Sequence, residues 1–263
     1  MTRRRLDTEL VRRKLVPSRA EARRVIDSGL VRVRDNPAPK PSTLVAPEEP
    51  VSLTAPPARF VSRAGAKLEG ALETFGIAVE GRRAIDVGAS TGGFSDCLLQ
   101  RGVAEVVAVD VGYGQMHHRI RVDERVTVVE RTNIRHADPE ALGAPFDLIV
   151  ADLSFISLAL VAPQLASLGS SDSDWVLLVK PQFEVGPELV GKGGIVRDPE
   201  SHVLAIEQAA DALAVNGIGV VGVVVSSITG TEGNREFLVH GRRAERVVDA
   251  GTVRAIVLEE SQA

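Results

Sequence analysis

The sequence is poor in cysteine and in aromatic residues. It has one cysteine, one tryptophan, one tyrosine and seven phenylalanines among 263 residues. A single cysteine, Cys97, excludes a disulfide within the chain. The first residues lack the apolar segment of a secretory signal, and no run of about 18 apolar residues is present to span a bilayer. These absences predict a protein of a reducing cytoplasm that does not enter membranes.

The charges are unevenly distributed along the chain. The formal net charge is −4, but residues 1–34 carry 11 Lys and Arg against four Asp and Glu, whereas residues 35–263 carry 20 against 31. The front of the chain therefore has an excess of seven positive charges, and the remainder has an excess of 11 negative charges. A polyanion would be bound by the N-terminal part.

The chain is expected to form two domains. The apolar spacing of residues 6–15 and the capping box Ser18–Glu21 predict two short helices near the N-terminus, with strand-like segments after them. Half of the 14 prolines fall between residues 37 and 57, which predicts loops and a linker. We therefore expect a small α+β domain at residues 1–58 and a larger domain at residues 59–263.

Apolar, β-branched segments alternate with helical segments in the larger domain. The predicted strands are Ala84–Val87, Val106–Asp110, Val126–Glu130, Phe146–Ala151, Trp175–Val179, Gly219–Val225 and Phe237–His240. This alternation is typical of a doubly wound α/β sheet with helices on both faces. Polar patches close three of these strands, at Asp86–Gly93, Ala151–Ile156 and Val179–Glu184. Because ligands bind at the carboxyl edge of such sheets, we expect the patches to form one site.

A glycine-rich loop follows the first predicted strand of this domain and opens a helix. It consists of Asp86, Gly88, Ala89, Ser90, Thr91, Gly92, Gly93 and Phe94. Its glycines would let backbone N–H groups approach a ligand closely, but their spacing is not that of a dinucleotide fold. An acidic residue just before the loop suits a cofactor with a sulfonium and an ammonium cation, such as S-adenosylmethionine. The alternative is a tight strand-to-helix turn that binds nothing.

Two polar residues beyond the loop favour the cofactor interpretation. Asp110 ends the second predicted strand, 24 residues after Asp86, where it can accept hydrogen bonds from a ribose diol. Asn133 follows the third strand and could hydrogen-bond the adenine edge. An ordinary strand-end aspartate and a turn-forming asparagine are the alternatives.

Four charged residues could activate an acceptor hydroxyl for methyl transfer. Lys180 ends the fifth predicted strand and Lys67 lies ahead of the first, whereas the carboxylates Asp152 and Glu236 lie at the ends of other strands. Methyl transfer from a sulfonium requires alignment of acceptor and donor and removal of the acceptor's proton. Two neighbouring ammonium groups make each other easier to deprotonate, so one could act as a base while the carboxylates orient the lysines. For each residue alone, a solvated strand-end charge is the alternative.

Missing motifs narrow the chemistry further. The chain has no Asn/Asp-Pro-Pro-Tyr/Phe segment, which grips the amino group of a base, and Asp152-Leu-Ser-Phe155 occupies that position. Cys97 falls within a predicted helix, so it is expected to pack and not to attack a pyrimidine carbon. The five histidines lack the spacing of a metal site, and we expect no catalytic metal.

The ordered motifs resemble the TlyA family of ribosomal RNA ribose 2′-O-methyltransferases, which is related to FtsJ-type enzymes. The similar segments are Leu10–Arg13, Val61–Arg63, Lys67–Leu68, Gly88–Phe94, Asp110–Gln115, Glu130–Asn133, Ala151–Ser157, Val179–Val185, Gly233–Asn234 and Glu236. The resemblance implies a Rossmann-like S-adenosylmethionine-dependent methyltransferase domain. It also implies a catalytic tetrad of Lys67, Asp152, Lys180 and Glu236, and a cytidine ribose in small-subunit and often large-subunit ribosomal RNA as substrate.

The basic N-terminal segment is similar to a small RNA-binding domain found in a ribosomal protein and in many pseudouridine synthases. The residues expected to contact phosphates are Arg3, Arg4, Arg5, Arg19 and Lys40. The scarcity of aromatic residues argues against base stacking as the main contact. A solvated basic helical pair without a ligand is the alternative.

Two other functions compete with the methyltransferase interpretation. Members of the TlyA family have been named haemolysins, but a cytolysin would need a signal, a long apolar helix or a strongly amphipathic basic helix. An inactive RNA-binding assembly factor is disfavoured by the intact tetrad. The target nucleotide, the choice of ribosomal subunit, the oligomeric state and the role of loop 187–194 stay open.

Overall fold

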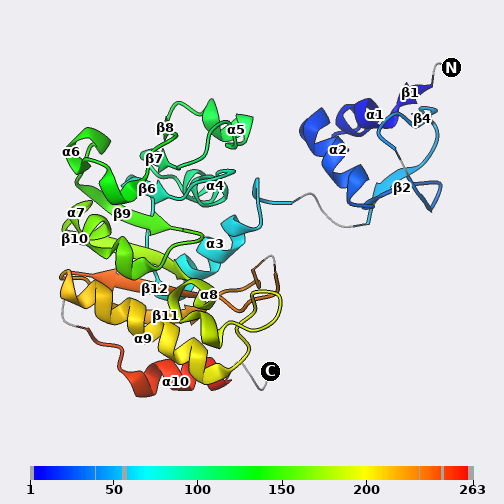
Figure 1. Cartoon of the computed structure of the whole chain (residues 1–263). Coiled ribbons are helices and arrows are strands. Elements are labelled where there is room, and N and C mark those ends of the chain that lie inside the picture. The colour runs from blue at the N-terminus through cyan, green and yellow to red at the C-terminus, as the bar shows by residue number, and fades with distance from the viewer. Residues whose placement is uncertain (1–2, 39, 55–57, 231, 244–245, 260–263) are drawn as a thin grey trace. The chain divides into compact units, whose positions relative to one another are not determined.

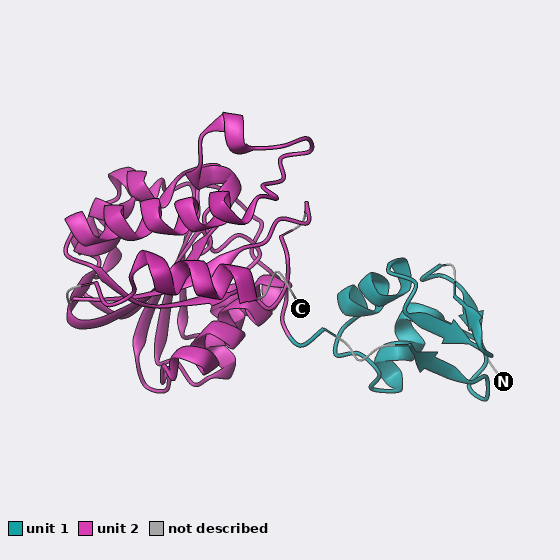
Figure 2. Cartoon of the chain, turned by 90° about the horizontal axis from the view of Figure 1, so that it is seen from below, with its two compact units in different colours: residues 1–59 teal, residues 60–263 magenta. Residues whose placement is uncertain are grey.

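The computed structural model describes residues 3–38, 40–54, 58–230, 232–243 and 246–259. The chain divides into two compact units, residues 1–59 and 60–263 (Figure 2). Residues 55–57, at the end of the predicted proline-rich linker, lie outside the described part of the chain.

The first unit is a small α+β domain with its own apolar core. Its elements are β1 (Arg4–Arg5), α1 (Leu6–Arg12), α2 (Arg19–Asp27), β2 (Val31–Val33), β3 (Asn36–Pro37), β4 (Leu44–Val45) and β5 (Val51–Leu53). Strands β1 and β4 pair antiparallel, and β3, β2 and β5 form a second antiparallel sheet. Ser18 caps α2 by accepting a hydrogen bond from the Glu21 backbone N–H at 3.2 Å, as the capping box predicts.

This unit differs from the sequence expectation in two places. Helix α1 ends at Arg12, before the apolar spacing ends, and Lys14 takes a left-handed backbone conformation with φ of 57°. The proline-rich segment, expected to form loops, contains the two-residue strands β3 and β4. Strands this short form only because they pair with a neighbouring strand, and the strand propensity of the residues themselves does not predict that pairing.

The second unit contains the predicted doubly wound sheet and its helices (Figure 1). Its strands are β6 (Arg83–Val87), β7 (Glu105–Val109), β8 (Val126–Val129), β9 (Phe146–Ala151), β10 (Gly169–Val179), β11 (Gly219–Val225) and β12 (Phe237–Arg242). Its α-helices are α3 (Ala64–Phe75), α4 (Gly93–Gln100), α5 (His118–Arg121), α6 (Pro139–Leu142), α7 (Ala162–Ser167), α8 (Pro181–Glu184), α9 (Pro199–Val215) and α10 (Ala250–Glu259). The described residues also form the short 3-10 helices η1 (Ile134–His136), η2 (Leu158–Leu160) and η3 (Pro187–Leu189).

The seven strands lie in the order β11-β12-β10-β9-β6-β7-β8. The five strands from β10 to β8 are parallel, whereas β12 runs antiparallel to both β10 and β11. The start of β12 therefore lies beside the carboxyl ends of the parallel strands. This arrangement brings Glu236, the residue before β12, to the edge where Asp152 and Lys180 follow β9 and β10.

Alternating side chains of the sheet form two core layers. One face packs against α3 and α4, with Leu68, Leu72 and Cys97 in the core. The other face packs against α7, α9 and α10, with Leu165, Ile206 and Val253 in the core (Figure 1). The two layers hold the sheet rigidly, so the loops at its carboxyl edge start from fixed positions.

Helix α9 is bounded by residues that favour helix ends. Asp198 accepts a hydrogen bond from the Ser201 backbone N–H at 3.0 Å, Pro199 takes the first helical position, and Gly217 follows the end of the helix with φ of 76°. These are the cap, start and stop that this residue pattern favours.

Candidate active site

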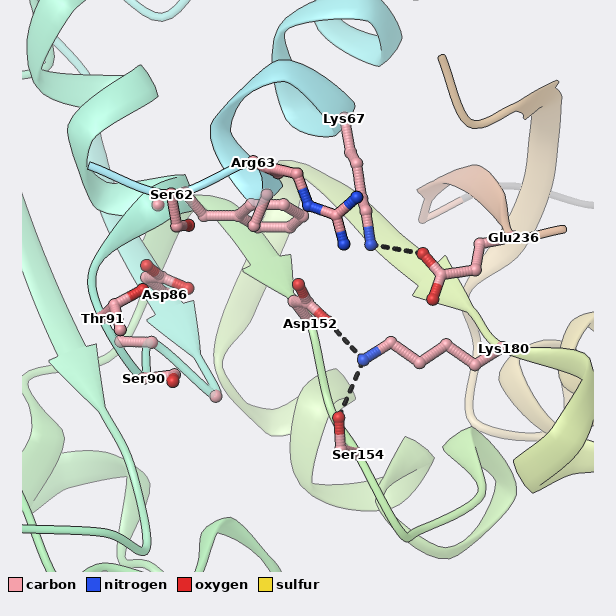
Figure 3. Close-up of a pocket in the computed structure, with 15 residues that line it drawn as sticks. Ser62, Arg63, Lys67, Asp86, Ser90, Thr91, Asp152, Ser154, Lys180 and Glu236 are labelled. Carbon is pink, nitrogen blue, oxygen red and sulfur yellow. Dashed lines mark hydrogen bonds and ion pairs between the residues drawn. The ribbon is translucent and has the colours of Figure 1, made fainter. Parts of the chain in front are cut away.

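A pocket of about 270 Å³ lies at the carboxyl edge of the parallel strands (Figure 3). It is lined by Ser62, Arg63, Ala64, Lys67, Asp86, Gly88, Ala89, Ser90, Thr91, Gly93, Phe94, Asp152, Ser154, Lys180 and Glu236. All four members of the predicted tetrad and most of the predicted glycine loop therefore share one cavity. Gly92, which is not among the lining residues, is the cap residue before α4 with φ of 90°, and a Cβ there would lie 3.2 Å from Ile120.

Lys180 is held from one side of this pocket by two groups. Its Nζ lies 2.6 Å from Asp152 Oδ1 and donates a hydrogen bond to Ser154 Oγ at 2.8 Å. The lysine follows β10 and is 9% exposed. Its partners follow β9, the neighbouring parallel strand, so the pairing follows from strand order.

Lys67 forms a second ion pair, with Glu236 (Figure 3). Both residues are buried, and the lysine comes from α3 while the glutamate comes from the turn before β12. Gly230 leaves room for this carboxylate, because a Cβ at that position would lie 2.5 Å from Glu236 Oε1. The two lysines thus each have a carboxylate partner, and both pairs line the same cavity.

Asp86 is the most deeply buried charged residue of the pocket, with 0% of the residue exposed. Its Oδ2 accepts hydrogen bonds from the backbone N–H and the hydroxyl of Ser95, at 2.9 and 2.6 Å. Its Oδ1 has no partner within the described part of the chain. Burial raises the pKa of Asp86 to about 7, although the hydrogen bonds from Ser95 oppose the shift. A cation bound beside Oδ1 would favour the charged form.

The glycine loop is shaped by close contacts that exclude side chains. Gly88 has φ of 84°, and a Cβ there would lie 2.6 Å from the Asp152 carbonyl oxygen. A Cβ at Gly93 would lie 2.1 Å from Ser62 Oγ. These two glycines therefore let β6, the segment before α3 and the loop after β9 approach one another around the pocket.

A second cavity of about 510 Å³ shares Gly88, Ser90, Asp152 and Ser154 with the first and contains Asp110 and Asn133. Asp110 Oδ2 accepts a hydrogen bond from the Ser90 N–H at 2.8 Å, and its Oδ1 accepts one from the Gly112 N–H at 2.7 Å. Each oxygen keeps capacity for another donor. Asn133 caps η1 by accepting a hydrogen bond from the Arg135 backbone N–H at 3.1 Å, as the turn-forming alternative predicts. The same residue also lines the second cavity.

Several lining residues had no role in the sequence analysis. Ser62 and Arg63 line the first cavity from the segment before α3, and Ser154 hydrogen-bonds Lys180. Phe155 is 91% exposed, has φ of 63°, and its ring centroid lies 5.2 Å from that of Phe183. Ser154, Phe155 and Phe183 lie in the polar patches with Asp152 and Lys180, and Ser62 and Arg63 lie a few residues before Lys67, so closeness in the sequence to the tetrad was the available signal.

The five predicted RNA-contacting residues, Arg3, Arg4, Arg5, Arg19 and Lys40, are exposed on the first unit. Three of them are paired with acidic residues, and a count of charges does not show such pairing. Arg5 and Arg19 contact Asp7, each at 3.0 Å, and Arg3 lies 3.8 Å from Glu49. The side chains of Arg3, Arg5 and Arg19 are therefore held in place by neighbouring carboxylates.

The described residues show neither a metal centre nor a membrane-spanning helix. Among the described residues, His, Cys, Asp and Glu side chains form no group of three or more that could hold a metal ion. Within the same residues, no helix has the length and apolar character needed to cross a membrane. Cys97 is fully buried in α4, in agreement with a packing role.

Comparison with known proteins identifies the two units. The FtsJ-like methyltransferase family matches residues 60–243, and the S4 domain family matches residues 4–51. A Mycobacterium tuberculosis protein named 16S/23S rRNA (cytidine-2′-O)-methyltransferase TlyA is 52% identical over 239 residues, which cover 89% of this chain and 88% of the relative.

Solved structures agree with this result. A Streptococcus thermophilus protein named as a hemolysin is 36% identical, has a TM-score of 0.77, and matches 100% of this chain and 97% of its own. A Listeria monocytogenes protein named as an S-adenosylmethionine-dependent methyltransferase is 13% identical with a TM-score of 0.50, matches 70% of this chain and 100% of its own, and shows the shared fold alone. These matches confirm the predicted S-adenosylmethionine-dependent methyltransferase fold and its methyltransferase class. The chain belongs to the TlyA family of FtsJ-like methyltransferases, in which an S4 domain precedes the methyltransferase domain.

Proposed function

We propose that the protein methylates the 2′-hydroxyl of a cytidine in small-subunit ribosomal RNA, with a large-subunit cytidine as a second target, and uses S-adenosylmethionine as methyl donor. The observation that carries this proposal is the presence of two lysine–carboxylate pairs in one cavity beside the glycine loop. The substrate is supported by the name of the Mycobacterium tuberculosis relative, which specifies cytidine 2′-O-methylation of 16S and 23S rRNA. A protein with this substrate works in the cytoplasm, among ribosomes.

The half of the site around β6 and β7 has groups that fit the cofactor. The free Oδ1 of Asp86 is a buried acceptor that suits a cation, and Gly88 and Gly93 line the cavity beside it. Asp110 and Asn133 line the adjoining cavity, where they would accept hydrogen bonds from the ribose and contact the adenine. S-adenosylmethionine supplies an electrophilic methyl group when bound there.

The half of the site around β10 and β12 would manage the acceptor's proton. A ribose hydroxyl is a very weak acid, so its attack needs a base or a cation that stabilises the alkoxide. We assign the hydroxyl proton to the neutral form of Lys180, which exists after its ammonium group has released a proton to solvent. Uptake of the hydroxyl proton restores the ammonium group, which Asp152 at 2.6 Å stabilises. Glu236 holds Lys67 as a fixed cation on the other side of the pocket, where it would orient and polarise the ribose.

The acceptor nucleotide also needs a place for its base. Phe155 presents an almost fully exposed ring next to Asp152 and Ser154, and Phe183 braces it. Aromatic rings of this kind stack against bases that have left their helix. This ring would hold the cytosine while the ribose enters the pocket.

The proposal is tested with purified full-length protein, labelled S-adenosylmethionine and unmodified small and large ribosomal subunits. We expect label at a cytidine ribose, detected as a position where alkali no longer cleaves the RNA backbone. Label on a base would contradict the proposal. Cofactor and RNA binding without methylation would favour an inactive assembly factor, and lysis of erythrocytes without RNA methylation would favour a cytolysin.

A further inference from the structure

A buried carboxylate lies among exposed arginines in the first unit. Asp7, in α1, is 0% exposed. Arg5 donates hydrogen bonds to Asp7 Oδ1 at 3.1 Å and to Oδ2 at 3.0 Å, and Arg19 donates to Oδ2 at 3.0 Å. Arg23 Nε lies 3.8 Å from the same Oδ2. One acid therefore contacts three arginines.

The three arginines remain open to solvent although their partner is not. Their side chains are 44%, 55% and 59% exposed for Arg5, Arg19 and Arg23. Arg19 and Arg23 lie four residues apart on α2, so they leave the helix on the same face. The cluster keeps a net positive charge after Asp7 is counted, and its guanidinium groups have N–H donors left over.

The burial of Asp7 is not explained by the needs of the core alone. A buried carboxylate is unfavourable unless it is paired, and here the hydrogen bonds from Arg5, followed by those from Arg19, hold the pKa of Asp7 well below its usual range. A negative charge in an RNA-binding surface also weakens attraction to phosphates. Asp7 can nevertheless favour RNA binding by ordering the arginine side chains, because an arginine that is already fixed loses less conformational freedom on binding.

We infer that Asp7 is a positioning residue that holds Arg5, Arg19 and Arg23 ready to contact closely spaced phosphates of ribosomal RNA. The inference rests on the proposed function. Because the three guanidinium groups share one carboxylate, they are fixed close together, which suits phosphates brought near one another by a folded RNA segment. Arg23 thereby joins the surface, although the sequence analysis did not include it.

The first test compares Asp7→Asn with Glu21→Gln in the full-length protein. Glu21 forms an ordinary ion pair with Arg24 at 2.7 Å on α2, so both substitutions remove one negative charge from the same unit. Charge alone predicts that both variants bind unmodified ribosomal subunits more tightly. Positioning predicts that Asp7→Asn binds more weakly, by roughly two- to tenfold for each arginine released, while Glu21→Gln does not.

Turnover separates this role from a general loss of structure. Asp7→Asn is expected to raise KM for subunits and to leave kcat and cofactor affinity unchanged, because the methyl-transfer pocket lies in the other unit. Circular dichroism verifies that the variant is folded at the assay temperature. If folded Asp7→Asn binds subunits as tightly as Glu21→Gln, the positioning role is refuted.

A second pair of variants does not depend on the folding of Asp7→Asn. Arg23→Gln and Arg24→Gln each remove one exposed positive charge from α2. We expect Arg23→Gln to reduce the slope of log binding constant against log salt concentration by about one, and Arg24→Gln to reduce it by clearly less. Equal reductions would overturn the inference. Absence of ribosomal RNA methylation by the wild-type protein would instead overturn the proposed function, and this inference with it.

Discussion

Replacement of Lys180 by Ala is expected to abolish methyl transfer and to leave cofactor binding nearly intact. The lysine is 9% exposed, and its Nζ contacts Asp152 and Ser154 at 2.6 and 2.8 Å, so the substitution removes the centre of the acceptor half of the pocket. Loss of a positioned general base lowers kcat by roughly 10²- to 10⁴-fold. That range corresponds to about 3–5 kcal/mol of transition-state stabilisation.

Cofactor affinity should change by only a few-fold, because Asp86 and the glycine loop have no contact with Lys180 among those observed. Loss of Lys180 also leaves the Asp152 carboxylate without its cationic partner, which favours a cationic ligand nearby. The assay combines single-turnover methylation of saturating ribosomal subunits with calorimetric titration of S-adenosylmethionine. Lys192→Ala is the matched control, since it removes a lysine from the exposed loop 187–194. Turnover of Lys180→Ala close to wild type would remove this lysine from the mechanism.

The Lys180→Arg variant distinguishes two possible roles of the lysine, as a base that accepts the hydroxyl proton or as a positive charge that stabilises the alkoxide. A guanidinium group keeps the positive charge but cannot act as a base near neutral pH. If Lys180 accepts the hydroxyl proton, the arginine variant should be as inactive as the alanine variant. Substantial activity of Lys180→Arg would show that the positive charge stabilises the alkoxide and that the proton goes elsewhere.

Three further predictions concern cofactor binding and the division of labour between the units. Asp86→Asn should weaken S-adenosylmethionine binding. In the wild-type protein, the pKa of Asp86 is about 7 in the folded state and about 3.8 in the unfolded chain, so the folded protein keeps a proton that the unfolded chain releases. The free energy of unfolding should therefore fall as the pH rises from 3.8 to 7, and Asp86→Asn should remove this fall. The fall is at most about 1.4 kcal/mol per pH unit between those two values. Chemical denaturation at pH 5 and pH 8 measures it, and an equal fall in Asp86→Asn and in the wild-type protein would contradict the prediction. Asp110→Ala should reduce cofactor affinity by roughly 1.5–3 kcal/mol per lost hydrogen bond, and unchanged calorimetry would refute that assignment. Deletion of residues 1–58 should preserve cofactor binding and remove most affinity for ribosomal RNA, which in the intact protein should fall steeply with salt; normal methylation by the truncated protein would disprove this division.

The sheet could be predicted from sequence because its strands are continuous apolar, β-branched runs. All seven predicted strands occur, from β6 (Arg83–Val87) to β12 (Phe237–Arg242). The two-residue strands β3 and β4 were missed, since their existence depends on partners elsewhere in the chain. The local pattern of apolar residues predicts strands that bury their own side chains in the core. It does not predict short strands that form only because they pair with a segment elsewhere in the chain.

The site could be predicted as a set of residues but not as a set of pairs. The strand-end argument collected Lys67, Asp152, Lys180 and Glu236, and all four line one cavity. Which carboxylate meets which lysine depends on the order of strands in the sheet, which a single sequence does not report. The same limit applies to the basic surface of the first unit, where the charge count included Asp7 as one negative charge among many.

Strand order also divides the proposed active site into two halves. The glycine loop and Asp110 follow β6 and β7, on one side of β9, whereas Lys180 follows β10 and Glu236 precedes β12 on the other side. The antiparallel direction of β12 is what brings Glu236 to this edge, because a parallel strand would place its first residue at the opposite edge. Asp152, at the end of the central strand β9, lines both cavities and contacts Lys180. Changes on the β6 side should therefore act on cofactor affinity and changes on the β10 side on kcat, and Asp152 is the residue at which both should change together.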